Sequence, residues 1–202
     1  MDLNSHWNAA SGIDDYVDQL WRKHRKLFTQ YRDQTTLPPD VIAEIGGHRL
    51  RILVLTEPYC DDSTQLVPIL WKLAHQVDSV ELRVLRQNEH PDLASRFLTP
   101  SGHPAIPVFI VLGEDGHDRG ALVERPSRVT EEIVAEVRGV QETHPDLPGI
   151  RRTLDRMPED TRAYVKQHIA RWRVDQHERW TRYLLEDIAA LIPAPSTPAH
   201  AR

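Results

Sequence analysis

The chain has 202 residues, of which 40% are hydrophobic and 27% charged, and its formal net charge is −5. This length and composition are typical of one well-packed globular domain with additions. The acidic balance excludes a generally basic nucleic-acid-binding surface, and the single cysteine excludes an intramolecular disulfide.

The first predicted element is an amphipathic helix over residues 12–32. Apolar side chains recur there at helical spacing, at Ile13, Val17, Leu20, Leu27 and Tyr31. Ser11, with Asp14 three positions later, resembles a capping box at the start of the helix. The sequence "TTLPPD" is expected to end it.

The middle of the chain alternates strand and helix patterns. Strands are predicted at 49–56, 80–86, 107–113 and 121–124, and helices at 62–77, 90–98 and 130–141, the last with Thr130 as its N-cap. The order is βαβ, a helical crossover, and then ββα. This order predicts an α/β protein with a mixed sheet covered by helices.

A long helical segment is predicted after Pro158 and reaches residue 191, with no internal proline or glycine. An unbroken helix of this length would extend about 50 Å. We therefore expect it to bend, to lie beside the N-terminal helix, or to project toward a partner. Arginines and aromatic residues between 151 and 182 raise nucleic-acid binding as an alternative. Because the aromatics fall on the apolar stripe, core packing or helix-mediated dimerisation is favoured.

The cysteine lies in the sequence "TEPYCDDSTQLVPIL", between a predicted strand and a predicted helix. Free N–H groups and the dipole at a helix start stabilise a thiolate and lower its pKa. Asp61, Asp62 and Glu57 lie close to Cys60 in the sequence, and nearby carboxylates raise a thiol pKa. The sequence leaves open which effect dominates.

These residues resemble the thioredoxin family, in which βαβ–α–ββα strands and helices carry a Trp-Cys-x-x-Cys site at a helix start. Here the corresponding sequence is "YCDDS", residues 59–63, and Pro68 matches the family's helix-kinking proline. In "HPAIPVFIVLGEDG", the Ile106–Pro107 bond matches the family's cis-proline. The acidic site also resembles that of a subgroup of bacterial thioredoxin-like proteins.

The resemblance predicts four regions along the chain. They are an N-terminal helical extension over 1–47, a thioredoxin-like domain over 48–142, a C-terminal helical extension over 143–192, and a disordered tail over 193–202.

Ser63 replaces the family's second cysteine, whose thiol releases the substrate from a mixed disulfide. The resemblance therefore implies an atypical monothiol protein with Cys60 and Ser63 as catalytic residues. Cys60 would attack a disulfide or an oxidant, and Ser63 would hydrogen-bond the thiolate. The expected partners are a protein disulfide and a low-molecular-weight thiol. The alternative is a non-catalytic thioredoxin-fold module that binds a partner without sulfur chemistry.

The resemblance also implies a substrate groove beside the cysteine, formed by Tyr59, Asp61, Asp62, Ile106 and Pro107. For the two aspartates, stabilisation of the helix start competes with selection of a cationic partner or of a metal. His103 precedes the proline element and is interpreted as a solvated loop residue. No cofactor and no metal are predicted, because the histidines show no zinc-ligand spacing.

The opening residues and the hydropathy of the chain indicate where in the cell the protein is expected. The opening residues have no basic segment followed by an apolar one, so a signal peptide is not expected. No apolar run approaches the ~20 residues that cross a bilayer. We expect a cytoplasmic protein with no membrane partner, and a homodimer through the terminal helices remains an open expectation.

Overall fold

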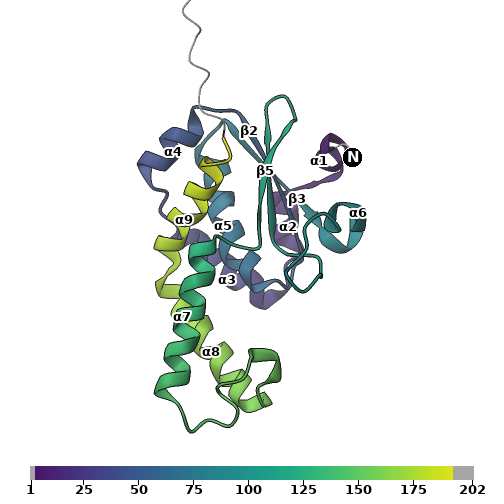
Figure 1. Cartoon of the computed structure of the whole chain (residues 1–202). Coiled ribbons are helices and arrows are strands. Elements are labelled where there is room, and N and C mark those ends of the chain that lie inside the picture. Colours follow the sequence, from purple (N-terminus) through teal and green to yellow (C-terminus); the bar gives the residue numbers. More distant parts are fainter. Residues whose placement is uncertain (1–2, 193–202) are drawn as a thin grey trace, which may run out of the picture.

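The computed structural model describes residues 3–192, in which a five-stranded mixed sheet lies between two layers of helices (Figure 1). The strands are β1 (Ser11–Gly12), β2 (Leu50–Thr56), β3 (Val80–Arg86), β4 (Val108–Gly113) and β5 (Asp118–Val123). Their order in the sheet is β1-β3-β2-β4-β5. β2 and β3 are parallel, and the other pairs are antiparallel. The α/β fold class with a thioredoxin-like sheet is therefore confirmed.

Helices cover both faces of the sheet. They are α1 (Leu3–Ala9), α2 (Ile13–Gln19), α3 (Arg22–Gln34), α4 (Pro39–Gly46), α5 (Asp61–Gln76), α6 (Pro91–Ala94), α7 (Ser127–Thr143), α8 (Glu159–Asp175) and α9 (His177–Ala189), with short 3₁₀ turns η1 (Gln87–Glu89) and η2 (Leu154–Arg156). In Figure 1, α4, α5 and α9 lie on one side of the sheet, and α1 and α6 lie on the other. Within residues 3–192, none of these helices has the length and apolar character that a bilayer crossing requires.

The central strand β2 is buried on both faces. Successive side chains of a strand point to opposite faces, so Ile52 and Val54 contribute to one hydrophobic cluster and Leu53 and Leu55 to the other. This explains why the strand is almost continuously apolar instead of alternating with polar residues.

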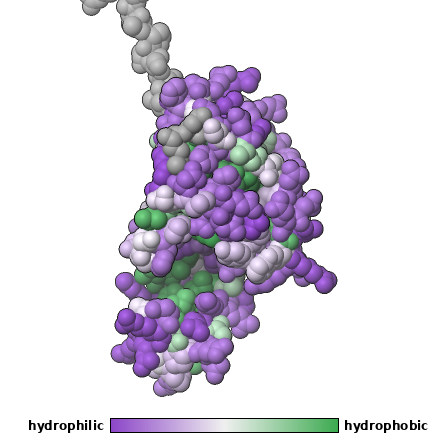
Figure 2. Space-filling view, turned by 90° about the vertical axis from the view of Figure 1, so that its right-hand side faces the viewer, coloured by the Kyte–Doolittle hydropathy of each residue, from purple (hydrophilic) through white to green (hydrophobic). Residues whose placement is uncertain are grey.

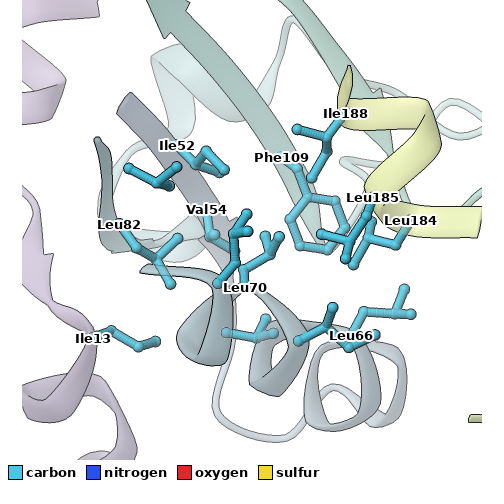
Figure 3. Close-up of a cluster of buried hydrophobic side chains, with 14 of the residues drawn as sticks. Ile13, Ile52, Val54, Leu66, Leu70, Leu82, Phe109, Leu184, Leu185 and Ile188 are labelled. Carbon is cyan, nitrogen blue, oxygen red and sulfur yellow. The ribbon is translucent and has the colours of Figure 1, made fainter. Parts of the chain in front are cut away.

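The larger cluster joins the sheet to helices from both ends of the chain. Phe109 of β4 lies against Leu184, Leu185 and Ile188 of α9, and Leu66 of α5 completes this group (Figure 3). Ile13 of α2 belongs to the same cluster. The terminal helices therefore form part of the main hydrophobic core.

The N-terminal segment differs from the single helix predicted over 12–32. Leu20 and Trp21 have extended backbone and separate α2 from α3. Leu20 is buried and Trp21 is exposed, so the break between α2 and α3 places one side chain in the core and the next in solvent. The predicted capping box is wrong, because Ser11 lies in β1 opposite Val84 and the N-cap is Gly12.

The C-terminal segment bends, which was one of the three expectations for it. α8 and α9 are separated at Gln176, and α9 lies against α4, α5 and α3. α8 instead pairs with α7, and this hairpin extends from the body of the molecule (Figure 1). The predicted cap Thr130 is wrong, because α7 begins at Ser127 after Pro126. The predicted tail over 193–202 lies outside the described residues.

Candidate functional site

Cys60 lies at the N-terminal end of α5, immediately after the loop that follows β2. It is the N-cap residue of the helix, and the Ser63 N–H donates a hydrogen bond to its Sγ at 3.5 Å. The Cys60 carbonyl oxygen accepts hydrogen bonds from the Thr64 N–H at 3.0 Å and the Thr64 hydroxyl at 2.8 Å. The thiol is thus held where a free helical N–H can reach it.

A second loop brings Ile106 and Pro107 to the cysteine. The Ile106–Pro107 peptide bond is cis. The Cys60 thiol donates to the Ile106 carbonyl oxygen at 3.8 Å, a contact between residues 46 positions apart. The start of α5 and the loop before β4 therefore meet at the sulfur atom.

Ser63 stands where the resemblance to the thioredoxin family places a second cysteine, and its hydroxyl also contacts the sheet. Its side chain is buried and shares a short hydrogen bond with the Thr56 hydroxyl at the end of β2. This contact anchors the first turn of α5 to the sheet. A hydroxyl cannot expel a substrate from a mixed disulfide, so the site contains one thiol and no dithiol pair.

The environment of Cys60 raises its pKa. Burial is the largest cause, and the charge of Asp62 acts in the same direction. Hydrogen bonds from the Ser63 side chain and backbone lower the pKa and offset these effects in part. The net effect is a raised pKa, and its largest cause is burial, which the sequence could not reveal.

Asp62 is enclosed by two arginines from distant parts of the chain. Both carboxylate oxygens form close ion pairs, one with Arg125 and the other with Arg173. Arg173 belongs to α8, and its Nε also donates to Gln65 Oε1 at 2.8 Å. Because the sequence separations are 63 and 111 residues, no local pattern could have revealed this network. Asp62 is thus paired within the chain.

Asp61 and Tyr59 face outward beside the site. Asp61 is 72% exposed, and its Oδ1 lies 3.3 Å from Nε2 of the buried His24. Tyr59 is 48% exposed, and its ring contacts the exposed indole of Trp21 with centroids 5.8 Å apart. Trp21 was not predicted as a site residue. Its exposure and its contact with Tyr59 are apparent only in the fold. Together the two rings form an aromatic surface next to Cys60.

Glu57 is fully buried behind the site. Its carboxylate pairs with Arg86 at 3.3 Å and accepts the Asn88 N–H at 2.8 Å. A partner cation and a backbone donor compensate the buried charge. His103 has its backbone bonded to Thr99 in an exposed loop, which agrees with its interpretation as a loop residue.

An apolar groove begins at the first turns of α5. It has a volume of about 310 Å³. The residues that line it include Asp61, Thr64 and Gln65 of α5, Leu27 of α3, Ile133 and Val137 of α7, and Val165 and Ile169 of α8. Figure 2 shows apolar surface in a hollow in the lower part of the molecule, where α7 and α8 project. The α7–α8 hairpin therefore provides one wall of a groove next to the candidate site.

A single cysteine at the start of a helix, in contact with a cis-proline loop at one end of a mixed sheet, is the arrangement of a thioredoxin-type protein. Sequence comparison identifies the family directly: the model described as "Thioredoxin" matches residues 11–138. The chain belongs to the thioredoxin family. No curated protein matches the sequence.

Two solved structures have a similar fold over nearly the whole chain. One is an HIV epitope-scaffold with 16% identity and a TM-score of 0.60, covering 95% of this chain and 97% of its own. The other is a Pseudomonas aeruginosa protein of unknown function with 18% identity and a TM-score of 0.58, covering 91% of this chain and 92% of its own. At this identity, the likeness concerns the fold alone.

Proposed function

We propose that the protein is a monothiol member of the thioredoxin family that exchanges disulfides through Cys60. The observation that carries the proposal is the position of the Cys60 sulfur. It lies 3.5 Å from the Ser63 N–H on one side and 3.8 Å from the Ile106 carbonyl oxygen on the other. A helix start supplies a donor for the thiolate, and the second loop supplies a surface for the substrate.

The proposed reaction has two exchange steps. The Cys60 thiolate attacks one sulfur of a disulfide, forming a mixed disulfide and releasing the other sulfur as a thiolate. A low-molecular-weight thiol then attacks the substrate sulfur of the mixed disulfide, which regenerates the Cys60 thiolate. Ser63 supports the first step by hydrogen bonding to sulfur. The proposed location is the reducing cytoplasm, which would supply the second thiol.

The groove residues have separate parts in this proposal. An extended substrate segment would lie along the Ile106–Pro107 loop and use backbone hydrogen bonds. Tyr59 would offer an apolar contact, and Asp61 would favour substrates with a nearby positive charge. Asp62 would act on the sulfur through its charge, since its carboxylate is engaged by arginines.

The raised pKa of Cys60 makes the proposed exchange slow at neutral pH. Only the small thiolate fraction reacts. As long as the pH is below the pKa, that fraction grows about tenfold with each unit by which the pH rises. The test is the rate of Cys60 alkylation by iodoacetamide from pH 6 to pH 10. We expect a single titration with a midpoint above the free-cysteine value of about 8.5. A native protein that is not alkylated at any pH in this range would contradict the proposal.

A second candidate function is a non-catalytic module that binds a peptide segment of a partner protein. The burial that raises the pKa of Cys60 and the apolar groove beside α5 favour it. Here the Cys60→Ser variant would keep full partner binding, whereas the monothiol mechanism requires the sulfur.

A homodimer through the terminal helices would use the α7–α8 hairpin, because the apolar side chains of α9 are buried in the core. Sedimentation equilibrium would detect such a dimer.

A further inference from the structure

Two histidines and an aspartate meet on the side of the sheet that α1 and α6 cover. His6 belongs to α1, His90 immediately precedes α6, and Asp92 lies in the first turn of α6. One ligand atom from each side chain lies within 4.8 Å of the other two. Among residues 3–192, it is the one group of three or more histidine, cysteine or acidic side chains with this geometry.

The spacing within this cluster suits a transition metal. His6 Nε2 lies 3.1 Å from Asp92 Oδ2. Around a tetrahedral zinc ion with ligand bonds of about 2.0–2.1 Å, neighbouring ligand atoms are roughly 3.3 Å apart. The His6 and His90 rings are inclined at 64° with centroids 5.6 Å apart, so a nitrogen of each can face a shared point. Small side-chain movements are enough to place the three atoms around one ion.

The three side chains of the cluster differ in their exposure to solvent. His6 is buried, His90 is half-buried and Asp92 is exposed. His90 also lines a small cavity of about 80 Å³ together with Arg86 and Glu89. Because Asp92 is exposed, the outer side of the cluster is open to water as a further ligand.

We propose that His6, His90 and Asp92 bind a divalent transition-metal ion, with Zn²⁺ as the expected ion and a fourth position open to solvent. Imidazole ligands favour such ions, whereas Ca²⁺ and Mg²⁺ prefer oxygen ligands throughout. The ion joins α1 to the start of α6 across 86 positions of the sequence. It therefore fastens the N-terminal helix α1 to α6.

The test is Zn²⁺ binding to the full chain, measured by isothermal titration calorimetry. We expect one ion per chain and a melting temperature that rises by about 5–10 °C when free Zn²⁺ is 100 times the dissociation constant. His90→Ala and Asp92→Asn each remove one ligand from a partly open position and should weaken binding at least about tenfold. Circular dichroism without metal establishes that both variants are folded.

Two control variants separate this cluster from other candidate ligands. His168→Ala removes a histidine from a two-member pair with Glu136, whose atoms are 2.6 Å apart. Cys60→Ser removes the only thiol in the chain. Both should retain the affinity of the unaltered chain. The proposal is overturned if the chain does not bind Zn²⁺, if His90→Ala and Asp92→Asn bind as tightly as the unaltered chain, or if a control variant abolishes binding.

Discussion

The charge of Asp62 acts on the cysteine through space, although its carboxylate is bound elsewhere. Its side chain is only 15% exposed and forms ion pairs with Arg125 and Arg173. These arginines compensate the negative charge that burial would otherwise disfavour. The same charge raises the pKa of Cys60. One residue thus links the C-terminal helices to the reactivity of the thiol.

Replacing this charge should activate the thiol. In Asp62→Asn the pKa of Cys60 should fall, because a negative charge is removed and two cations lose their partner. The alkylation profile would then move to lower pH. The same change should cost about 1–3 kcal/mol of unfolding free energy, since the amide keeps one acceptor oxygen and its NH₂ group leaves donors of the other arginine without an acceptor.

The neighbouring Asp61→Asn variant is the matched control for this change. Its carboxylate is 72% exposed, where solvent screens its effect on the sulfur. We expect a smaller shift of the alkylation profile and almost no loss of stability. Equal shifts in both variants would show that the enclosed charge of Asp62 has no special part.

Ser63→Cys should convert the site into a dithiol. The Ser63 backbone nitrogen already lies 3.5 Å from the Cys60 sulfur, which places the new side chain close to it. We expect an intramolecular disulfide on oxidation, seen as a loss of two thiols in a titration with a thiol reagent. Ser63→Ala should form none. It should lose about 1–2 kcal/mol of stability, because the Thr56 hydroxyl then lacks its partner. Two free thiols after oxidation of Ser63→Cys would mean that the side chains diverge.

At the scale of elements, His177 fastens the start of α9 to α3. Its Nε2 contacts the Thr35 hydroxyl at 2.9 Å and the Tyr31 carbonyl oxygen at 3.0 Å. Burial lowers the pKa of His177 to about 4, although the Tyr31 hydrogen bond opposes the shift. The folded protein therefore keeps this imidazole neutral under conditions in which the unfolded chain is protonated.

This difference predicts a loss of stability in weak acid. Above pH 6.5 both states are neutral at His177, and its contribution is fully present. Below pH 6.5 the unfolded state gains a proton that the folded state does not, so stability falls by up to about 1.4 kcal/mol per pH unit until about pH 4. Urea unfolding at pH 7.5, 6 and 5 measures this slope. The His177→Gln variant should show a shallower slope, and parallel curves would contradict this assignment.

Because α9 is part of the hydrophobic core, substitutions in it should destabilise the protein more than substitutions in α7. Leu184 is fully buried in the cluster that includes Phe109, so Leu184→Ala should cost about 2–5 kcal/mol of unfolding free energy. Val134 on α7 is 43% exposed, and Val134→Ala should cost less than about 1 kcal/mol. Comparable losses in the two variants would mean that α9 does not hold the core together.

For the molecule as a whole, those parts of the fold that depend on local sequence pattern could be predicted. The βαβ–α–ββα order, the strand at 80–86 and the helix after Cys60 follow from hydrophobic periodicity and from the proline and cysteine positions. The positions of the breaks at Leu20 and Gln176 could not be predicted in this way, although a bend of the C-terminal segment was one of the expectations. Both depend on which distant surface each helix covers, and helical spacing continues across them.

The candidate site was predictable only in part. Cys60, Ser63 and the Ile106–Pro107 loop could be placed in one site from the resemblance to the thioredoxin family, and the structure brings them together. The partners that modify the site, Arg125 and Arg173, come from positions 63 and 111 residues from Asp62. The His6 cluster likewise joins residues 86 positions apart, so it carries no motif. The division of the chain at 47 and 142 stays a prediction, although helices beyond both positions belong to the main core.

Cys60 is proposed to act as a single exchanging thiol in the folded protein. The most direct measurement is intact-protein mass spectrometry after incubation with glutathione disulfide at pH 7, 8 and 9. The monothiol mechanism predicts one added glutathione per chain, formed faster at each higher pH, absent in Cys60→Ser and removed by reduced glutathione. A folded protein that acquires no glutathione at any of these pH values would contradict it and favour the binding module.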